Sequence, residues 1–208
     1  MRITTIFVVA DEPDVHNLLS DLFDRENLHN EIFTTVESFL ERISTEMSGC
    51  LLLDISLPGM GMEGLNNLLV QLGNKLPIIT VGHSNDWRSA IEGLKKGALD
   101  FLEKPFAGEE VLEAVKHALQ LNIDKRCYLR QRMEAQQRFG KLTKRESEVL
   151  GCMLESKASK DIADQLAMSI RTVEFHRSNI MKKMEADSPI DLGRMDAMAF
   201  GCYCVRNL

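Results

Sequence analysis

Cys50-Leu51-Leu52-Leu53-Asp54 is the stretch that decides the fold of the first half of this 208-residue chain. An apolar run that ends in a carboxylate is typical of a central parallel strand, because such a strand is covered on both faces. Further strand-like runs lie at 3–10, 31–35, 77–82 and 99–103. Together these runs predict a sheet of five parallel strands.

Helical segments separate these predicted strands. In the first of them the apolar residues recur at helical spacing, namely Val15, Leu18, Leu19, Leu22 and Phe23. We expect the others at 36–43, 63–72, 87–96 and from about 108. Strands that alternate with helices predict an α/β fold with a doubly wound parallel sheet.

Three charged residues fall at or just past the ends of predicted strands: Asp11, Asp54 and Lys104. The carboxyl ends of parallel strands meet at one edge of the sheet, where doubly wound sheets bind ligands. We therefore expect these three side chains to lie close together and to form a functional site.

From Leu142 onward the pattern becomes entirely helical. Thr143 and Glu146 have the spacing of a capping box, which predicts a helix over 143–155. Further helices are expected at 159–166, at 170–184 after the N-cap Ser169, and at 189–199. The sequence thus predicts an α/β domain at 1–121, a partly helical linker at 122–140 and a helical domain at 141–208.

The net charge of −6 is unevenly distributed along the chain. Residues 1–121 carry −10, residues 122–140 carry +3 and residues 141–208 carry +1. The acidic first domain would repel nucleic acid, so any DNA binding by the second domain must use a local face of that domain.

The composition argues against a secreted or membrane protein. Five cysteines follow no disulfide-framework spacing, which suits a reducing compartment. No run approaches the ~20 apolar residues of a membrane span, and we see no signal peptide. We expect a cytoplasmic protein without a membrane partner.

The segment Gly97-Ala98-Leu99-Asp100-Phe101-Leu102-Glu103-Lys104-Pro105-Phe106, with Asp11, Asp54 and Pro58, resembles the receiver domain of two-component response regulators. The resemblance covers about 120 residues and implies a flavodoxin-like (βα)5 fold. It implies that Asp54 accepts a phosphoryl group from a sensor histidine kinase, and that Lys104 pairs with the phosphate. It also implies that the Lys104–Pro105 peptide is cis.

The same resemblance implies a Mg²⁺ cofactor, held by Asp11, Asp54 and the main-chain carbonyl of Ser56. The chemistry is consistent with this, because two neighbouring carboxylates repel each other unless a cation lies between them. Mg²⁺ takes oxygen ligands and bridges to phosphate, and Lys104 would add a point charge. Together they would neutralise the transferring phosphoryl group.

Two departures from the receiver pattern concern the metal and the nearby loop. Ala10 stands where receivers have a second acid, and Glu12 lies one place too late to replace it. We expect Mg²⁺ binding to be weakened, by ~10–100-fold if the loss resembles that of an outer-shell group. The loop 58–64 is two residues longer than usual.

A third departure concerns the residues that would report phosphorylation. The position of the switch hydroxyl falls on Gly82. Thr80 could substitute only if the end of the strand shifts register, and Ser84 is another candidate substitute. Phe101 fills the aromatic switch position but lacks the hydroxyl of a tyrosine. These departures leave open a receiver fold that does not respond to phosphate.

The second domain resembles the LuxR/FixJ-type helix-turn-helix domain. The resemblance lies in Leu142–Leu150, Lys160–Ala163 and Ser169–Met184, and it spans nearly all of 141–200. Val173, Ile180 and Met184 would face the core, which leaves a face with charged, aromatic and hydroxyl side chains exposed. Such a face suits a recognition helix in the major groove of DNA.

The predicted DNA contacts are of two kinds. The resemblance places base contacts at Glu174, Phe175 and Ser178; a glutamate can accept from cytosine, and a phenylalanine can pack on a thymine methyl. The phosphate contacts that we expect are Lys160, Arg171, Thr172, Arg177 and Lys182. His176 could contact phosphate or form a structural hydrogen bond, and core packing is the alternative for Phe175.

The sequence therefore predicts a response regulator of the FixJ/NarL type, in which phosphorylation of Asp54 controls binding to operator half-sites in double-stranded DNA. A homodimer on DNA is expected, with RNA polymerase as a candidate further partner. The candidate dimer face, which could instead pack on the core, comprises Ile190, Leu192, Met195, Met198 and Ala199.

One alternative is an atypical receiver that is regulated by a partner or ligand, independently of phosphorylation. Another is a small phosphatase that uses Asp11 and Asp54, against which the helix-turn-helix argues. No other catalytic constellation is evident in the sequence, so we do not expect an enzyme.

Overall fold

The computed structural model describes residues 4–44, 47–58, 61–71, 73, 76–83 and 87–201. Two predicted features fall outside these ranges, the substitute hydroxyl of Ser84 and the centre of the 58–64 loop. The chain divides into two compact units, Met1–Arg126 and Cys127–Leu208.

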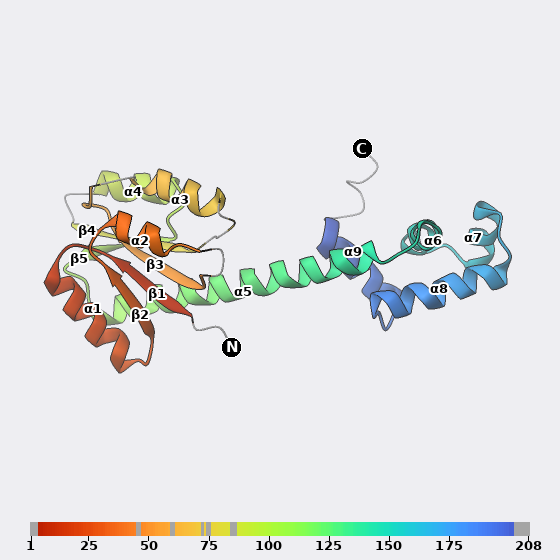
Figure 1. Cartoon of the computed structure of the whole chain (residues 1–208), viewed down its shortest axis with the longest axis horizontal. Helices are drawn as coiled ribbons and strands as arrows, with labels where there is room; N and C mark the ends of the chain where they lie inside the picture. The colour runs from red at the N-terminus through yellow and green to blue at the C-terminus, as the bar shows by residue number, and fades with distance from the viewer. Residues whose placement is uncertain are drawn as a thin grey trace. The chain divides into compact units, whose positions relative to one another are not determined.

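The first unit contains a five-stranded sheet in the order β2-β1-β3-β4-β5 (Figure 1). Every neighbouring pair is parallel. The strands are β1 (Thr5–Val9), β2 (His29–Phe33), β3 (Gly49–Asp54), β4 (Ile78–His83) and β5 (Asp100–Lys104). The predicted doubly wound parallel sheet is confirmed, and β2 begins two residues earlier than the sequence indicated.

Helices cover both faces of this sheet (Figure 1). They are α1 (Pro13–Arg25), α2 (Val36–Arg42), α3 (Gly61–Gln71), α4 (Trp87–Lys95) and the first part of α5 (Gly108–Gly140). Apolar side chains of α1 and α5 pack on one face, and those of α2 and α3 pack on the other. Strand β3 is buried along its whole length, as its continuous apolar run predicted.

The register of the strands gathers the charged residues at one edge. Asp54 is the last residue of β3, and residues 10–12 follow directly after β1. Lys104 ends β5 and pairs with His83, the last residue of β4. The carboxyl ends of β1, β3, β4 and β5 therefore meet where the sequence placed the site.

At the opposite edge, α5 is attached to the segment that leads into β3. Asn122 is buried, and its Oδ1 accepts hydrogen bonds from the Gly49 N–H at 3.1 Å and the Ser48 hydroxyl at 3.2 Å. Arg126 donates to the carbonyl of Met47 at 2.8 Å. The helix continues to Gly140, so the segment 122–140, which the sequence assigned to a partly helical linker, is helical throughout.

In the part of the chain that the structure describes, the second unit contains the last part of α5 and four further helices. They are α6 (Lys144–Leu154), α7 (Ser159–Leu166), α8 (Ile170–Met184) and α9 (Pro189–Phe200). The predicted capping box is present at the start of α6, and the Ser169 hydroxyl accepts from the Thr172 N–H at 3.0 Å at the start of α8. The sequence thus located the starts of both helices by their caps.

The apolar core of this unit explains most of the stripe on α9. Leu192 and Ala199 are fully buried, and Met195 packs against the core cluster. Ile190, in contrast, is 75% exposed. Packing on the core therefore explains Leu192, Met195 and Ala199, whereas Ile190 lies outside the core. None of the helices that the structure describes combines the length and apolar character needed to cross a bilayer.

Candidate functional site

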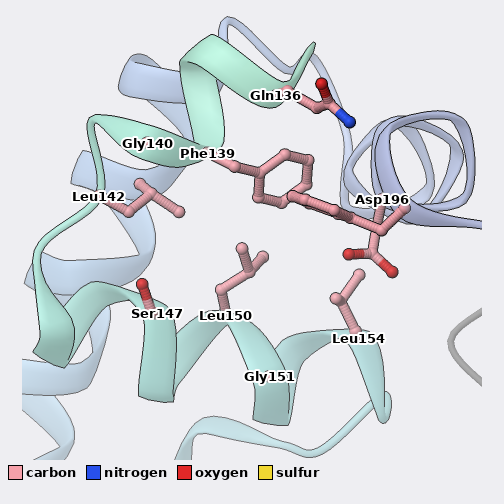
Figure 2. A pocket seen from close by; sticks show the side chains of 10 residues that line it. Gln136, Phe139, Gly140, Leu142, Ser147, Leu150, Gly151, Leu154 and Asp196 are labelled. Carbon is pink, nitrogen blue, oxygen red and sulfur yellow. The ribbon is translucent and has the colours of Figure 1, made fainter. Parts of the chain in front are cut away.

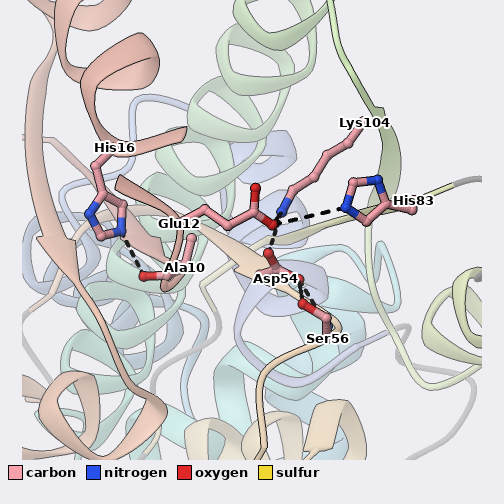
Figure 3. Close-up of polar contacts among 7 residues, drawn as sticks. All are labelled: Ala10, Glu12, His16, Asp54, Ser56, His83 and Lys104. Carbon is pink, nitrogen blue, oxygen red and sulfur yellow. Dashed lines mark hydrogen bonds and ion pairs between the residues drawn. The ribbon is translucent and has the colours of Figure 1, made fainter. Parts of the chain in front are cut away.

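Asp54 is the centre of the acidic edge in the first unit (Figure 3). It is 2% exposed at the end of β3. Its Oδ2 accepts a charged hydrogen bond from Lys104, and its Oδ1 accepts from the Ser56 N–H at 2.8 Å and the Ser56 hydroxyl at 2.6 Å. Both carboxylate oxygens are therefore held in place.

These contacts keep Asp54 and Lys104 ionised. Burial acts to raise the pKa of Asp54, but the hydrogen bonds from Lys104 and Ser56 outweigh it and hold that pKa below its usual value. Burial acts to lower the pKa of Lys104, but the carboxylates of Asp54 and Glu12 raise it above its usual value. At neutral pH the site thus offers an anionic oxygen next to a fixed ammonium group.

Glu12 belongs to this site, although the sequence placed it one residue too late. Its Oε1 accepts from Lys104 Nζ at 2.8 Å and lies 4.0 Å from Nε2 of His83 (Figure 3). Residue positions along the chain do not reveal this contact, because it depends on the reach of the longer glutamate side chain. Its only local signal was that it is a second acid, directly after Asp11 in the segment that follows β1.

Asp11, Glu12 and Asp54 could hold a metal ion. Each offers one carboxylate oxygen, and these oxygens all lie within 4.8 Å of one another. Oxygen ligands of this kind suit Mg²⁺, so the donor set fits the cofactor that the sequence predicted. Ser56 lies beside Asp54, and the role of its carbonyl as a ligand stays a prediction.

Ala10 is part of the hydrophobic core at the edge of this site. It is 1% exposed and packs in the same apolar cluster as Val8 and Val15. Its carbonyl oxygen accepts from Nε2 of His16 at 2.6 Å. Its methyl side chain cannot ligate a metal, so any further acidic ligand must come from elsewhere.

The structure does not bring Thr80 to the site. Thr80 is fully buried, lies against α4 at Gly93, and its hydroxyl donates to the carbonyl of Asp100 at 3.1 Å. As a strand residue two places before Gly82, it lies further from the carboxyl end of β4. The interpretation of Thr80 as a substitute for the switch hydroxyl is therefore wrong.

Gly82 lies in a tightly filled space. A Cβ atom added there would lie 2.7 and 2.8 Å from side-chain atoms of Ile55 and 3.3 Å from the ring of Phe101. Real Cβ atoms essentially never come within 3.0 Å of a heavy atom outside their own residue and its chain neighbours, so Ile55 would have to move. Ile55 and Phe101 thus crowd the place where the receiver pattern has a hydroxyl side chain that this sequence lacks.

The second candidate site is the exposed face of α8. Its predicted core residues Val173, Ile180 and Met184 are all fully buried. Phe175 is 62% exposed, which excludes core packing as the reason for it. The other exposed members of the predicted DNA face are Lys160, Arg171, Thr172, Glu174, Ser178 and Lys182, and Arg177 is partly buried.

Two residues on α8 have surroundings that the sequence did not predict. The Ser159 hydroxyl, at the start of α7, donates to the carboxylate of Glu174. Among the described residues, Nδ1 of His176 is buried without a hydrogen-bond partner. The structural hydrogen bond that was the alternative for His176 is thus not formed through Nδ1 in the described part of the chain.

An open pocket of about 740 Å³ lies between α6, α9 and the end of α5 (Figure 2). Its walls are mixed: Phe139, Leu150 and Leu154 contribute apolar surface, and Gln136 and the buried Asp196 of α9 contribute polar surface. The pocket contains none of the predicted site residues.

Comparison with known proteins divides the chain in the same way. Residues 6–116 match the family model of the response regulator receiver domain, and residues 140–195 match that of bacterial regulatory proteins of the luxR family. Response regulator protein TodT of Pseudomonas putida is 35% identical over 194 residues, which cover 93% of this chain and 86% of TodT. Transcriptional regulatory protein FixJ of Azorhizobium caulinodans is 34% identical over 195 residues, which cover 93% of this chain and 92% of FixJ.

Among solved structures, the response regulator StyR has a TM-score of 0.83 and 33% identity, covering 93% of this chain and 98% of StyR. The structure called FixJ-N has a TM-score of 0.52 and 29% identity, covering 58% of this chain and 96% of FixJ-N.

Proposed function

The chain belongs to the two-component response regulators that join a receiver domain to a LuxR-type DNA-binding domain, and on this premise we propose that phosphorylation of Asp54 controls its binding to DNA. The observation that carries this proposal is the environment of Asp54. It is a buried, ionised carboxylate next to the ammonium group of Lys104 and two further acids.

The proposed reaction is a phosphoryl transfer from a histidine of a sensor kinase. An Asp54 oxygen attacks the phosphorus, the bond from phosphorus to the histidine nitrogen breaks, and the electron pair stays on that nitrogen. Lys104 leaves the carboxylate oxygen and pairs with the new phosphate, so its charge stays in the site. Mg²⁺, held by Asp11, Asp54 and the Ser56 carbonyl, would supply further positive charge to the phosphoryl oxygens.

The DNA-binding half would act through the exposed face of α8. We propose that Glu174, Phe175 and Ser178 contact bases in the major groove. The contacts to phosphate would come from Lys160, Arg171, Thr172, Arg177 and Lys182, with His176 as a further candidate. Binding would be as a homodimer on two half-sites, with RNA polymerase as a candidate partner.

A second candidate function is a receiver domain controlled by a partner or ligand instead of phosphate. The packing around Gly82 favours it, because Ile55 and Phe101 fill the space of the switch side chain. Such a protein could accept a phosphoryl group without passing the signal to its DNA-binding half.

One experiment separates the two candidates. The protein is incubated with acetyl phosphate and Mg²⁺, and its intact mass and DNA affinity are measured beside those of Asp54→Ala. We expect an added phosphoryl group on the wild type only, together with tighter DNA binding. An adduct on Asp54→Ala would refute the proposed site, and an adduct without any change in DNA affinity would favour the second candidate.

A further inference from the structure

We propose that Glu12 supplies the acidic metal ligand that Ala10 cannot supply. This inference rests on the proposed function in one respect, that Asp11 and Asp54 bind the cation used in phosphoryl transfer. It concerns this chain in particular, because residue 10 carries only a methyl group and is buried in the apolar core.

Two carboxylates of this site converge on one cation. The ammonium group of Lys104 lies 2.8 Å from Glu12 Oε1 and also donates to Asp54 Oδ2 (Figure 3). Glu12 and Asp54 thus already hold a single positive charge between them. Asp11 offers a third oxygen within 4.8 Å of both carboxylates.

The side chain of Glu12 is placed so that it can take this role. Glu12 occupies the N-cap position of α1 with φ −83° and ψ 115°, and its side chain does not cap the described helix. Its main chain is held in place, because its carbonyl accepts from the His16 N–H at 3.1 Å. The side chain is 43% exposed and can turn from Lys104 to a bound cation.

The arrangement makes Lys104 and the metal ion competitors for Glu12 and Asp54. An incoming phosphoryl group offers Lys104 a new partner, and the move of Lys104 onto the phosphate leaves Glu12 to the metal. Glu12 would therefore connect metal binding to phosphorylation, a role that its position in the sequence did not predict.

The test measures Mn²⁺ binding to the full-length protein by electron paramagnetic resonance, with Mg²⁺ as competitor and without any phosphoryl donor. We expect Glu12→Gln to weaken binding roughly 10–100-fold. Asp14→Asn is the matched control, because it removes one exposed negative charge from the same helix outside the cluster. A loss of affinity in Glu12→Gln no larger than in Asp14→Asn would overturn the inference, as would a wild type that does not bind Mn²⁺.

Two further variants sharpen the test. Lys104→Met removes the competing ammonium group, so Mn²⁺ should bind more tightly than to the wild type, and weaker binding would count against the inference. Ala10→Asp in the Glu12→Gln background should restore affinity, because the acid returns at position 10. Since Ala10 is buried, thermal melting by circular dichroism checks that the variant with Ala10→Asp folds. If it does not fold, the Mn²⁺ affinities of Lys104→Met and Glu12→Gln test the inference.

These outcomes are distinct from those of the phosphorylation experiment. A protein that is phosphorylated on Asp54, but binds Mn²⁺ equally well with and without Glu12, retains the proposed function and loses only this inference.

Discussion

Ile55 occupies the space that a side chain at position 82 would need: a Cβ added to Gly82 would lie 2.7 Å from its Cγ1. The packing around position 82 therefore leaves no room for the hydroxyl side chain that this position lacks. We expect Gly82→Thr alone to lower the free energy of unfolding by about 1–3 kcal/mol through overpacking.

The Ile55→Ala/Gly82→Thr double variant should recover part of that loss. Urea unfolding of both single variants and the double variant gives the coupling between the two positions. We also expect a larger effect of acetyl phosphate on DNA affinity in the double variant than in Gly82→Thr. Additive losses of stability would show that Ile55 can move aside without cost.

Lys104→Met should destabilise the protein in metal-free buffer. The variant leaves Asp54 as a buried carboxylate without its ammonium partner, so we expect a loss of roughly 3 kcal/mol in urea unfolding at neutral pH. Added MgCl₂ should restore part of the loss, because the cation replaces the missing charge. The control Lys116→Met breaks only the exposed pair with Glu26 and should cost less than about 1 kcal/mol.

Glu146 should make the second unit sensitive to acid. The pKa of Glu146 is lowered to about 2, and the largest cause is the hydrogen bond from Lys183. Burial acts to raise this pKa, and the hydrogen bonds from Thr143 lower it further. Because the folded pKa lies below the ordinary value of 4.5, the stabilisation is complete above that value. It should be lost as the pH falls from about 4.5 toward 2.

The measurement compares Glu146→Ala with the wild type in urea at several pH values. At neutral pH we expect a loss of about 1–2 kcal/mol, because both the capping box and the ion pair disappear. This difference should shrink below pH 4.5. Glu148→Ala, which breaks the partly exposed pair with Arg145, should change stability by less than about 1 kcal/mol at any pH.

Phe175→Ala should change the sequence preference of DNA binding without affecting the fold. Phe175 is largely exposed, so its truncation should change the free energy of unfolding by less than about 0.5 kcal/mol. Binding to a library of DNA sites gives the preference, and thermal melting gives the stability. An equal loss of affinity on every sequence would contradict a role in base contact.

Lys182→Ala should weaken DNA binding uniformly. A lysine that contacts phosphate contributes charge without sequence information, so the preference among sites should not change. The slope of log affinity against log salt should fall by about 1. A titration at several salt concentrations measures both effects, and an unchanged slope would remove Lys182 from the phosphate contacts.

Much of the fold and part of the site followed from local patterns in the sequence. The apolar run before Asp54 identified the central strand, and the spacing of Thr143 and Glu146 identified the start of α6. The cis peptide at Lys104–Pro105, expected from resemblance alone, is also confirmed. The lysine side chains that contact Asp54 and Glu146 were harder to predict, because they come from segments that are distant in the sequence.

By itself, the sequence determined the order of strands and helices and brought Asp11, Asp54 and Lys104 to one edge. It could do so because burial sets the period of apolar residues, and parallel strands share their carboxyl ends. Only the tertiary structure decided that Glu12 joins the site, that Thr80 lies too far back along β4 to reach it and that Ile55 closes the space at Gly82. These outcomes depend on the reach and packing of side chains across neighbouring strands, which residue spacing along the chain does not contain.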